Sequence, residues 1–350
     1  MAKINVRSPY FINLATTNLT TAKLELKIYI GAVSTAFQGA IQYTLNSTAI
    51  NAKVNFEISE LVKDYIQTEF DGAFPSTPVS ATEATTVFVD YRTTETLSSG
   101  SPVVTTVLAV RGFYGYGYFE NGVNPVLGDA RLESNSSILK NTNSTVTIAV
   151  DNTIATSLNW KYEGSVVSTI SIPAQTDIQN QITYVTNTGN FNVDQAVIGI
   201  GASKTETINI ESYEKCKYTP IKLIFINKFG AYQEIWMFAN SILSMATTEE
   251  RYKSNILTNG TYNTYDPQIK LLTKNGNQTL KLNSDYYPES YNEVFRQLFL
   301  SEKVWIDYLG DTLGVNIENK QITYKTSLTD SLINYTIDVS FAFNTINNIR

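Results

Sequence analysis

The stretch of sequence that decides the fold runs from Lys217 to Phe238 and reads KYTPIKLIFINKFGAYQEIWMF. Apolar residues occupy both faces of an extended chain over 221–226 and return over 235–238. A strand with two apolar faces has to be buried on both sides. Between the two halves lies Asn227-Lys228-Phe229-Gly230, where glycine can adopt a positive φ and the chain can reverse. The stretch therefore predicts a buried central hairpin.

A family resemblance rests on this stretch and on the opening segment Ile4–Ile12, INVRSPYFI. The pieces YTPIKLIFINKFGA and QEIWMF resemble virion structural proteins of crAss-like and related podovirus-type tailed bacteriophages. The resemblance covers the N-terminal segment and residues 214–350 and is thin in between. It implies a structural protein that forms an oligomeric ring in the tail or head-to-tail connector of a virion. These pieces are strand and turn residues with packing roles, so no functional residue is transferred from the family.

Length and hydropathy indicate an ordinary globular protein. The chain has 350 residues, of which 43% are hydrophobic, and this length suits two or three domains. Its beginning lacks the apolar core of a signal peptide, and no apolar run is long enough to span a membrane. We therefore expect synthesis in the cytoplasm and no membrane partner. The resemblance implies that the cytoplasm is that of a bacterial host and that the final location is the virion.

The absence of histidine weakens most enzymatic interpretations. Histidine is the commonest general base and metal ligand, and the chain has none and a single cysteine, Cys216. Ser-His-Asp catalysis and zinc sites are therefore excluded. Carboxylate pairs such as Glu57/Glu60 or Asp90/Asp307 could hydrolyse glycosides only if the fold brought them together. We expect no enzyme, no catalytic residue, no metal and no cofactor.

The charge distribution argues against sequence-specific nucleic-acid binding. The net charge is −6, and residues 1–213 carry 12 Lys/Arg against 18 Asp/Glu, while 214–350 carry 14 of each. Gripping a phosphate backbone needs clustered Lys and Arg, and no such cluster occurs. The resemblance implies that the partners are copies of the chain in a ring and other tail, portal or connector proteins, with possible passage of DNA through the ring.

Alternating apolar residues predict a mainly β protein with a few helices, built from β-sandwich domains. We expect an N-terminal β-rich domain with one helix over 1–140, a small β-sandwich over 141–213 and a C-terminal β-rich domain with one helix over 214–350. A polar linker is predicted over 134–144, before the sandwich.

Two helices are predicted by apolar spacing. The first should begin at Ser59 and end before Gly72, and the second should begin at Pro288. Each precedes a similar strand, VFVDY at 87–91 and VWIDY at 304–308. The repetition raises the hypothesis of a duplicated module, which would resemble the tail-tube fold of tailed phages, a sandwich with a flanking helix. Alternatively, both strands simply follow a common strand pattern.

Residues 247–264 are polar and predict an irregular segment. Beyond them, two short apolar runs flank Asn275-Gly276, which is a strong signal for a tight β-hairpin turn. We therefore expect a short hairpin centred on this dipeptide.

The Gly/aromatic segment 112–119, GFYGYGYF, is the candidate interface. Its glycines permit close approach, and its aromatic rings bury area at low entropic cost, so we expect Tyr114, Tyr116 and Tyr118 to pack on a neighbouring subunit. The alternative for the segment is an ordinary strand. The alternative for the protein is a host-attachment or carbohydrate-binding module, because tyrosine suits protein interfaces and sugar surfaces equally.

Overall fold

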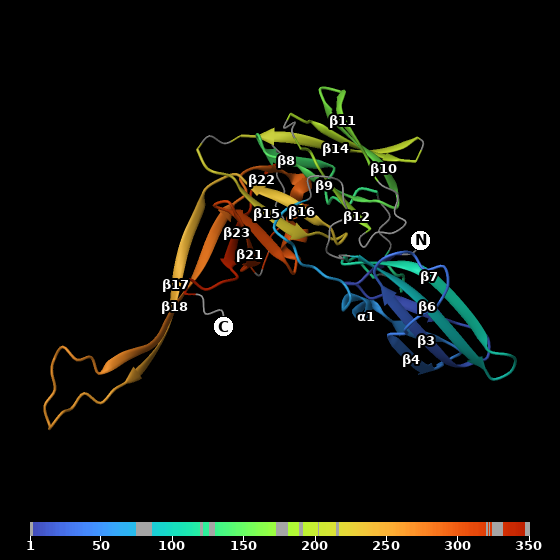
Figure 1. Cartoon of the computed structure of the whole chain (residues 1–350), viewed down its shortest axis with the longest axis horizontal. Helices are drawn as coiled ribbons and strands as arrows, with labels where there is room; N and C mark the ends of the chain where they lie inside the picture. Colours follow the sequence, from blue (N-terminus) through green and yellow to red (C-terminus); the bar gives the residue numbers. More distant parts are fainter. Residues whose placement is uncertain are drawn as a thin grey trace. The chain divides into compact units, whose positions relative to one another are not determined.

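The computed structural model describes residues 3–74, 86–119, 122–125, 130–172, 181–188, 192–201, 203–214, 217–319, 321, 323 and 332–346. Strands make up 54% of the structure and helices 5%. The strands form several sheets, so the prediction of a mainly β, sandwich-rich protein is confirmed (Figure 1).

The chain divides into two compact units. Unit 1 contains Met1–Glu214, Ile224–Ile235 and Glu293–Glu302. Unit 2 contains Lys215–Leu223, Trp236–Asn292 and Lys303–Arg350. The N-terminal part and the sandwich that follows it therefore belong to one unit, and the central hairpin contributes residues to both.

The first sheet of unit 1 has the order β1-β7-β6-β3-β4. Its strands are β1 (Lys3–Asn5), β3 (Leu19–Tyr29), β4 (Tyr43–Thr48), β6 (Thr86–Leu97) and β7 (Val103–Phe113). A separate antiparallel ribbon consists of β2 (Phe11–Leu14) and β5 (Val54–Glu57). Apolar residues at alternate positions of β3, such as Leu24 and Leu26, are fully buried, which is the pattern of a sheet with one covered face.

The inserted sandwich of unit 1 combines a five-stranded and a two-stranded sheet, with orders β11-β10-β13-β14-β8 and β12-β9. Their strands are β8 (Ser137–Asn141), β9 (Thr147–Asp151), β10 (Ala155–Tyr162), β11 (Ser165–Ser171), β12 (Ile182–Thr186), β13 (Gln195–Ile200) and β14 (Lys204–Tyr213). Trp160 and Leu158 are buried in its core. The predicted linker over 134–144 is wrong, because β8 pairs in parallel with β14 and buries Leu139 and Lys140.

Unit 2 is built on a seven-stranded sheet with the order β16-β15-β20-β21-β23-β18-β17. Its strands are β15 (Ile221–Ile226), β16 (Tyr232–Met237), β17 (Ser241–Lys253), β18 (Ile269–Asn283), β20 (Val304–Tyr308), β21 (Asp311–Ile317) and β23 (Thr336–Phe341). A short pair joins β19 (Tyr287–Pro288) to β22 (Leu332–Ile333). A 3-10 turn, η1 (Glu289–Tyr291), leads into the helix α2 (Asn292–Phe299), which begins close to the predicted position.

The predicted central hairpin is confirmed. β15 and β16 are neighbours in the sheet, and most of their residues are buried. The chain reverses through Asn227–Gly230, where Gly230 has φ +80° and Asn227 N–H donates to the Ala231 carbonyl at 2.9 Å. The glycine is required here because other residues rarely adopt this φ.

The first helix is shorter than predicted. α1 covers only Ser59–Lys63, and its N-cap is Ile58, whose side chain cannot cap, whereas Ser59 is the first helical residue. Beyond it the chain turns to bury Ile66 and to place Phe70 against Tyr232 at 5.1 Å between ring centroids. Tertiary packing of these apolar residues therefore overrides their helical spacing.

The predicted hairpin at Asn275-Gly276 is wrong. Both residues lie inside β18, where they pair with Thr248 and Thr247 of β17. The segment over 247–264, predicted as irregular, is strand β17 as far as Lys253. β17 and β18 pair over thirteen positions of β17, and the chain reverses in 254–268. Every residue of β17 is exposed, so no face had to be apolar and the sequence shows no alternation.

The two similar strands occupy different environments. The first lies in β6, where Asp90 is fully buried, and the second is β20, where the side chain of Asp307 is 43% exposed. Duplication of a module remains a hypothesis.

Candidate functional site

The Gly/aromatic segment packs first of all within unit 1, against the turn of the central hairpin. Tyr116 N–H donates to the Lys228 carbonyl at 2.8 Å. A Cβ on Gly115 would lie 2.5 Å from that carbonyl oxygen, and a Cβ on Gly230 would lie 2.8 Å from the backbone of Tyr114. The two glycine-containing segments, far apart in sequence, thus touch backbone to backbone. The close approach of these two backbone segments explains why Gly115 and Gly230 are glycines. The contact lies within the subunit and not between subunits.

The three tyrosines have different surroundings. Tyr114 is 5% exposed, and its hydroxyl donates a hydrogen bond to Glu302. Arg7 lies 5.6 Å from the ring centroid of Tyr114 and 5.2 Å from that of Tyr116. Tyr118 is 64% exposed, with Arg296 5.1 Å from its ring centroid. Tyr114 therefore packs inside the subunit, and the interface role of Tyr114, Tyr116 and Tyr118 stays a prediction.

The charges around Tyr114 compensate one another. Burial and the hydrogen bond to Glu302 raise the pKa of Tyr114. Burial tends to raise the pKa of Glu302, but the Tyr114 hydroxyl and the charges of Arg7 and Lys63 bring it below its ordinary value. The phenol therefore stays neutral and the carboxylate ionised at neutral pH, which describes a stable contact and gives no proton donor or acceptor for catalysis.

The carboxylates that the sequence offered as catalytic candidates also have structural partners. Glu57 accepts hydrogen bonds from Tyr10 N–H and from Ser59 at the start of α1. Asp90 accepts from Ala109 N–H at 2.7 Å, and Asp307 lies 3.8 Å from Lys222. Among the described residues, no group of three or more metal-binding side chains occurs. Cys216 lies outside the described residues.

A buried ion cluster joins the first sheet to the inserted sandwich. Asp151 of β9 lies 2.7 Å from Lys3 of β1 and 2.9 Å from Arg111 of β7. Burial alone would raise the pKa of Asp151, but the two cations lower it. All three side chains are nearly inaccessible, so the cluster fixes the two sheets together and offers nothing to a ligand.

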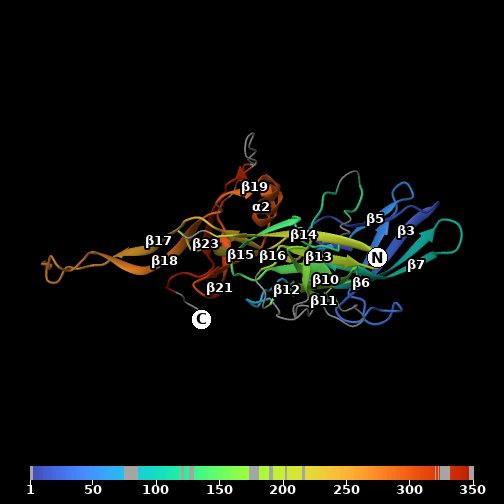
Figure 2. The same cartoon turned by 90° about the horizontal axis from the view of Figure 1, so that it is seen from above.

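The ribbon β17–β18, which we call the arm, is the most exposed part of the described chain. Figure 2 shows it leaving the rest of its sheet as two strands. β23 pairs with β18 only over Thr279–Asn283, and residues 345–346 bond to Asn275 and Gly276. Within the described residues, 249–274 therefore have no neighbour outside the arm. Exposed apolar side chains continue along it, including Met245, Leu271 and Leu272.

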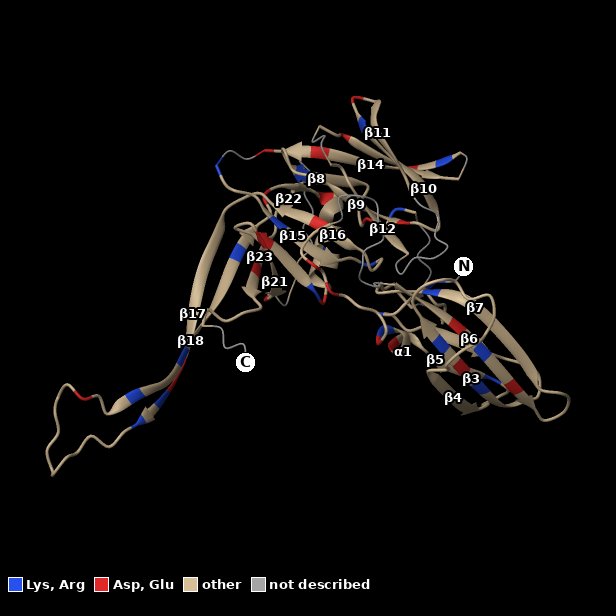
Figure 3. Cartoon of the chain, viewed as in Figure 1, with Lys and Arg blue, Asp and Glu red and all other residues tan. Residues whose placement is uncertain are grey.

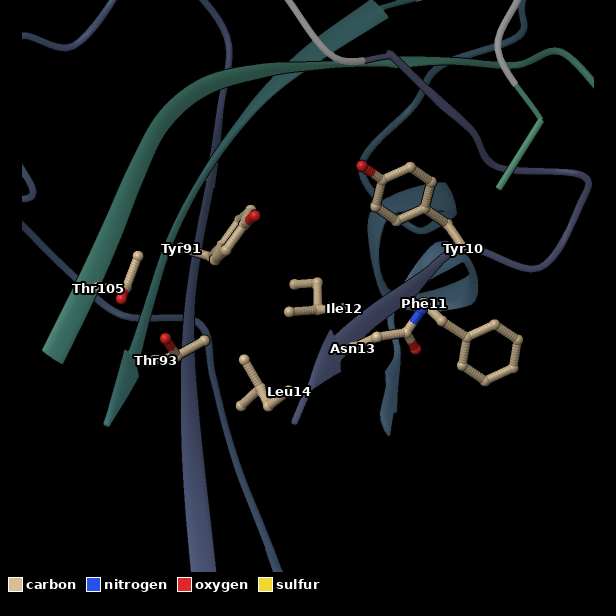
Figure 4. Close-up of a pocket in the computed structure, with 8 residues that line it drawn as sticks. All are labelled: Tyr10, Phe11, Ile12, Asn13, Leu14, Tyr91, Thr93 and Thr105. Atoms are coloured by element: carbon tan, nitrogen blue, oxygen red, sulfur yellow. The ribbon is translucent and has the colours of Figure 1, made fainter. Parts of the chain in front are cut away.

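Two cavities flank strand β2 in unit 1. The inner cavity, of about 340 Å³, lies between β2 and the first sheet. It is lined by Tyr10, Phe11, Ile12, Asn13, Leu14, Tyr91, Thr93 and Thr105. Figure 4 shows Ile12 and Leu14 pointing toward Tyr91 and Thr93, while Phe11 points away. The outer cavity, of about 470 Å³, is lined mainly by Phe11, Asn13, Lys53, Asn55 and Phe119.

The inner cavity contains polar groups that can bind a ligand. Burial raises the pKa of Tyr10 and of Tyr91, so both hydroxyls stay protonated at neutral pH and can donate. The Thr93 side chain is 1% exposed, and its hydroxyl has no hydrogen-bond partner in the described structure. Buried hydroxyls are normally satisfied. Tyr10, Tyr91 and Thr93 were not predicted from the sequence as site residues, because they become neighbours only when the β2–β5 ribbon packs on the first sheet.

Comparisons with protein-family models and with curated proteins give no match for this chain. No helix in the described parts of the chain is long and apolar enough to cross a membrane.

Proposed function

We propose that the chain is a structural subunit of a tailed-bacteriophage virion and forms an oligomeric ring in the tail or head-to-tail connector. The observation that carries the proposal is the arm: thirteen consecutive residues of β17 are exposed. An isolated two-stranded ribbon is marginally stable in water, and a long edge strand invites pairing with another chain. Subunits of a permanent assembly can keep such a ribbon because the neighbour covers it.

The apolar content of the arm supports a covered state. Ile242, Leu243 and Met245 near its base are 54%, 48% and 56% exposed, and Leu272 farther out is 65% exposed. Contiguous exposed apolar surface marks interaction sites in soluble proteins. The segment 241–248 also lacks any charged residue that would block edge-to-edge association.

The charge distribution supports a second copy of the chain as the partner. Residues 241–283 hold 5 Lys/Arg and 3 Asp/Glu, which leaves 21 and 29 of the chain's 26 and 32 for all other residues. The arm is therefore net positive and the remainder net negative (Figure 3). Opposite net charges favour association between the arm of one copy and the body of the next.

A ring follows from this kind of contact. An arm that binds a different surface on the next copy makes a heterologous interface, and repetition of that interface closes into a ring when the rotation permits. The resemblance of the central hairpin and the N-terminal segment to phage virion proteins supports a place in a tail or connector. Partners of such a ring would be the adjacent tail, portal or connector proteins.

The experiment replaces 249–274 with a two-residue Asn-Gly turn that joins Thr248 to Asn275, which face each other across the ribbon. We expect the wild-type chain to form particles of one fixed copy number by light scattering and electron microscopy. The shortened chain should stay monomeric with an unchanged unfolding midpoint, because the removed residues contact only the arm.

The control is Leu309→Ser, which removes an apolar side chain that is 88% exposed and lies outside the arm. This variant should assemble like the wild type. A wild-type chain that stays monomeric at every concentration, or a shortened chain that assembles normally, contradicts the proposal.

A further inference from the structure

The outer edge of β2 is an open strand edge. Tyr10 accepts the Ile58 N–H on the β5 side, and Ile12 lies opposite Phe56. Backbone groups alternate in direction along a strand, so those of Phe11 and Asn13 face away from β5. Asn13 is exposed, and neither its N–H nor its carbonyl has a partner in the described structure. One residue of the edge is therefore ready to pair with another strand.

At Phe11, the preceding residue whose backbone faces outward, the side chain of Asn124 already occupies the place of an added strand. Its side-chain carbonyl accepts the Phe11 N–H at 2.9 Å, and its side-chain amide donates to the Phe11 carbonyl at 2.8 Å. These two bonds are the pair that an added strand would make with Phe11. The edge thus presents its backbone groups in the geometry that strand pairing requires. Phe11 has a partner in Asn124, whereas the backbone groups of Asn13 remain available.

Both cavities border this edge and share Phe11, Asn13 and Leu14 in their linings. The inner cavity adds residues of the first sheet, and the outer cavity adds Lys53, Asn55 and Phe119. An added strand directs alternate side chains to opposite faces, so one set would enter the inner cavity and the other the outer cavity. Strand addition works in this way elsewhere: backbone bonds supply affinity, and pockets for alternate side chains supply specificity. The Thr93 hydroxyl, which has no hydrogen-bond partner in the described structure, could bond to a hydroxyl- or amide-bearing side chain that enters the inner cavity.

We infer that the outer edge of β2 receives the arm tip of a second copy of this chain by strand addition. The tip, 254–265, reads SNILTNGTYNTY and contains no charged residue. Most of its side chains carry a hydroxyl or an amide, and Leu257, Tyr262 and Tyr265 are 59%, 60% and 80% exposed. Among the residues that line the two cavities, Lys53 carries the one charge. An uncharged tip rich in hydrogen-bonding groups thus matches an uncharged inner cavity with an unsatisfied hydroxyl.

The inference rests on the proposed ring, and its first test separates the groove from the arm. Asn13→Pro removes an N–H that has no partner in the subunit, and proline is tolerated on an edge strand. Asn13→Ala keeps the N–H and is the matched control. We expect Asn13→Pro to weaken association at least tenfold at an unchanged unfolding midpoint. Asn13→Ala trims one side chain that lines the outer cavity but keeps the N–H, so it should weaken association much less than Asn13→Pro. Equal assembly of both variants overturns the inference and leaves the ring intact.

A mixing experiment tests whether the Asn13→Pro variant is folded and has lost only its groove. Tyr262→Ser combined with Tyr265→Ser alters exposed tip residues only. This tip variant and Asn13→Pro should each be monomeric alone, whereas a mixture should give dimers that do not grow, because one intact tip meets one intact groove. A mixture that stays monomeric while the wild type forms rings overturns the inference.

A peptide experiment decides the inference even if the ring proposal fails. The probe is a fluorescent peptide of residues 252–267, added to the tip variant and followed by anisotropy. We expect saturable binding that Asn13→Pro abolishes and that Thr93→Val weakens at least tenfold. Absence of peptide binding overturns the inference. So does a groove that binds an oligosaccharide, loses it on Tyr10→Ala and keeps it on Asn13→Pro, since that site would recognise sugars and not backbone.

Discussion

The central hairpin and the arm are both antiparallel hairpins, and their turns contain a glycine with the same φ of +80°, Gly230 and Gly260. Their surroundings are opposite. The turn of the central hairpin is enclosed, with the backbone of Tyr114 beside Gly230, whereas nothing lies within 4 Å of the position that a Cβ would take on Gly260. One local geometry thus serves a packed junction in unit 1 and an exposed projection in unit 2.

The difference shows what shapes each sequence. In β15 and β16 burial requires apolar side chains on both faces, so the segment is dense in Ile, Phe and Trp. In the arm the subunit imposes no such requirement, and polar, charged and apolar residues follow one another without a period. Packing within the subunit therefore does not account for the apolar residues of the arm, which is why we propose that a neighbouring copy covers them.

Hydrogen exchange should show the largest difference between the two hairpins. In the monomer, amides of 249–274 should exchange through local opening at almost no free-energy cost, whereas those of β15 should exchange only on global unfolding. We expect the opening free energies to differ by about 5 kcal/mol or more, the scale of whole-domain stability. Exchange–mass spectrometry of the unassembled chain measures this difference. Equal protection would mean that the arm is covered within its own subunit.

Gly230→Ala and Gly260→Ala compare the two turns directly. Alanine at 230 adds backbone strain at φ +80° and a clash at 2.8 Å with Tyr114, so we expect the free energy of unfolding to fall by about 4 kcal/mol. At 260 the strain acts on the arm alone, and the global value should change by less than about 0.5 kcal/mol. Urea titration followed by tryptophan fluorescence measures both. Similar losses at the two sites would refute the enclosed junction.

Asn227 tests the polar side of the same junction. Its side-chain carbonyl accepts from the N–H groups of Phe229 and Ala231, and its amide donates to the Leu132 carbonyl at 2.6 Å. Asn227→Ala would leave these buried groups without partners, which should lower the free energy of unfolding by about 3 kcal/mol.

The matched control is Asn275→Ala, on the arm, where water can replace the exposed bonds to Ile346. Its cost should stay below about 1 kcal/mol in the same titration. A larger loss at Asn275 than at Asn227 would show that the base of the arm contributes more to stability than the junction does.

The sequence was sufficient for elements with a buried face. The central hairpin followed from its apolar residues on both faces, and the mainly β class followed from apolar alternation in other strands, because buried faces of strands require apolar side chains. It was misleading where burial is absent: the arm lacks alternation, and Asn275-Gly276 has the composition of a turn although its neighbours hold it in an extended strand. The sequence predicted a linker where the sandwich begins. The residues around β8 are polar, and the strand forms there because it pairs with β14, which is distant in sequence.

The candidate site was less accessible to prediction. Tyr114, Tyr116 and Tyr118 stand out by composition, yet only the fold shows that the first is enclosed and the last is exposed. The strand edge at Asn13 depends on Asn124 and Thr93, which are distant in sequence and form no motif with it. A local pattern could not have indicated a site whose parts are brought together by packing alone.

Glu133 gives the smallest expected effect, and it tests the enclosed character of unit 1 through pH. Its side chain is 2% exposed, and it accepts a hydrogen bond from Ala149 N–H at 3.1 Å. Burial is the main reason that its pKa rises to about 8, and the charge of Glu234 in β16 adds to the rise. The folded state therefore holds a proton that the unfolded chain, with an ordinary carboxyl pKa of 4.5, releases. Stability from this group is fully present below the unfolded pKa and is lost as pH rises toward about 8.

Glu133→Gln removes the ionisable group and keeps an acceptor for Ala149. The variant should match the wild type near pH 4.5 and exceed its free energy of unfolding by at least about 2 kcal/mol at pH 8, because ionisation of this carboxyl in the unfolded chain favours unfolding of the wild type alone. The control is Glu250→Gln on the exposed arm, which should change the free energy of unfolding by less than about 0.5 kcal/mol. Urea titrations across this pH range provide the measurement. An advantage of the Gln variant that is the same at every pH would show that Glu133 does not titrate in the folded protein, and the loss of stability toward pH 8 would then need another buried group.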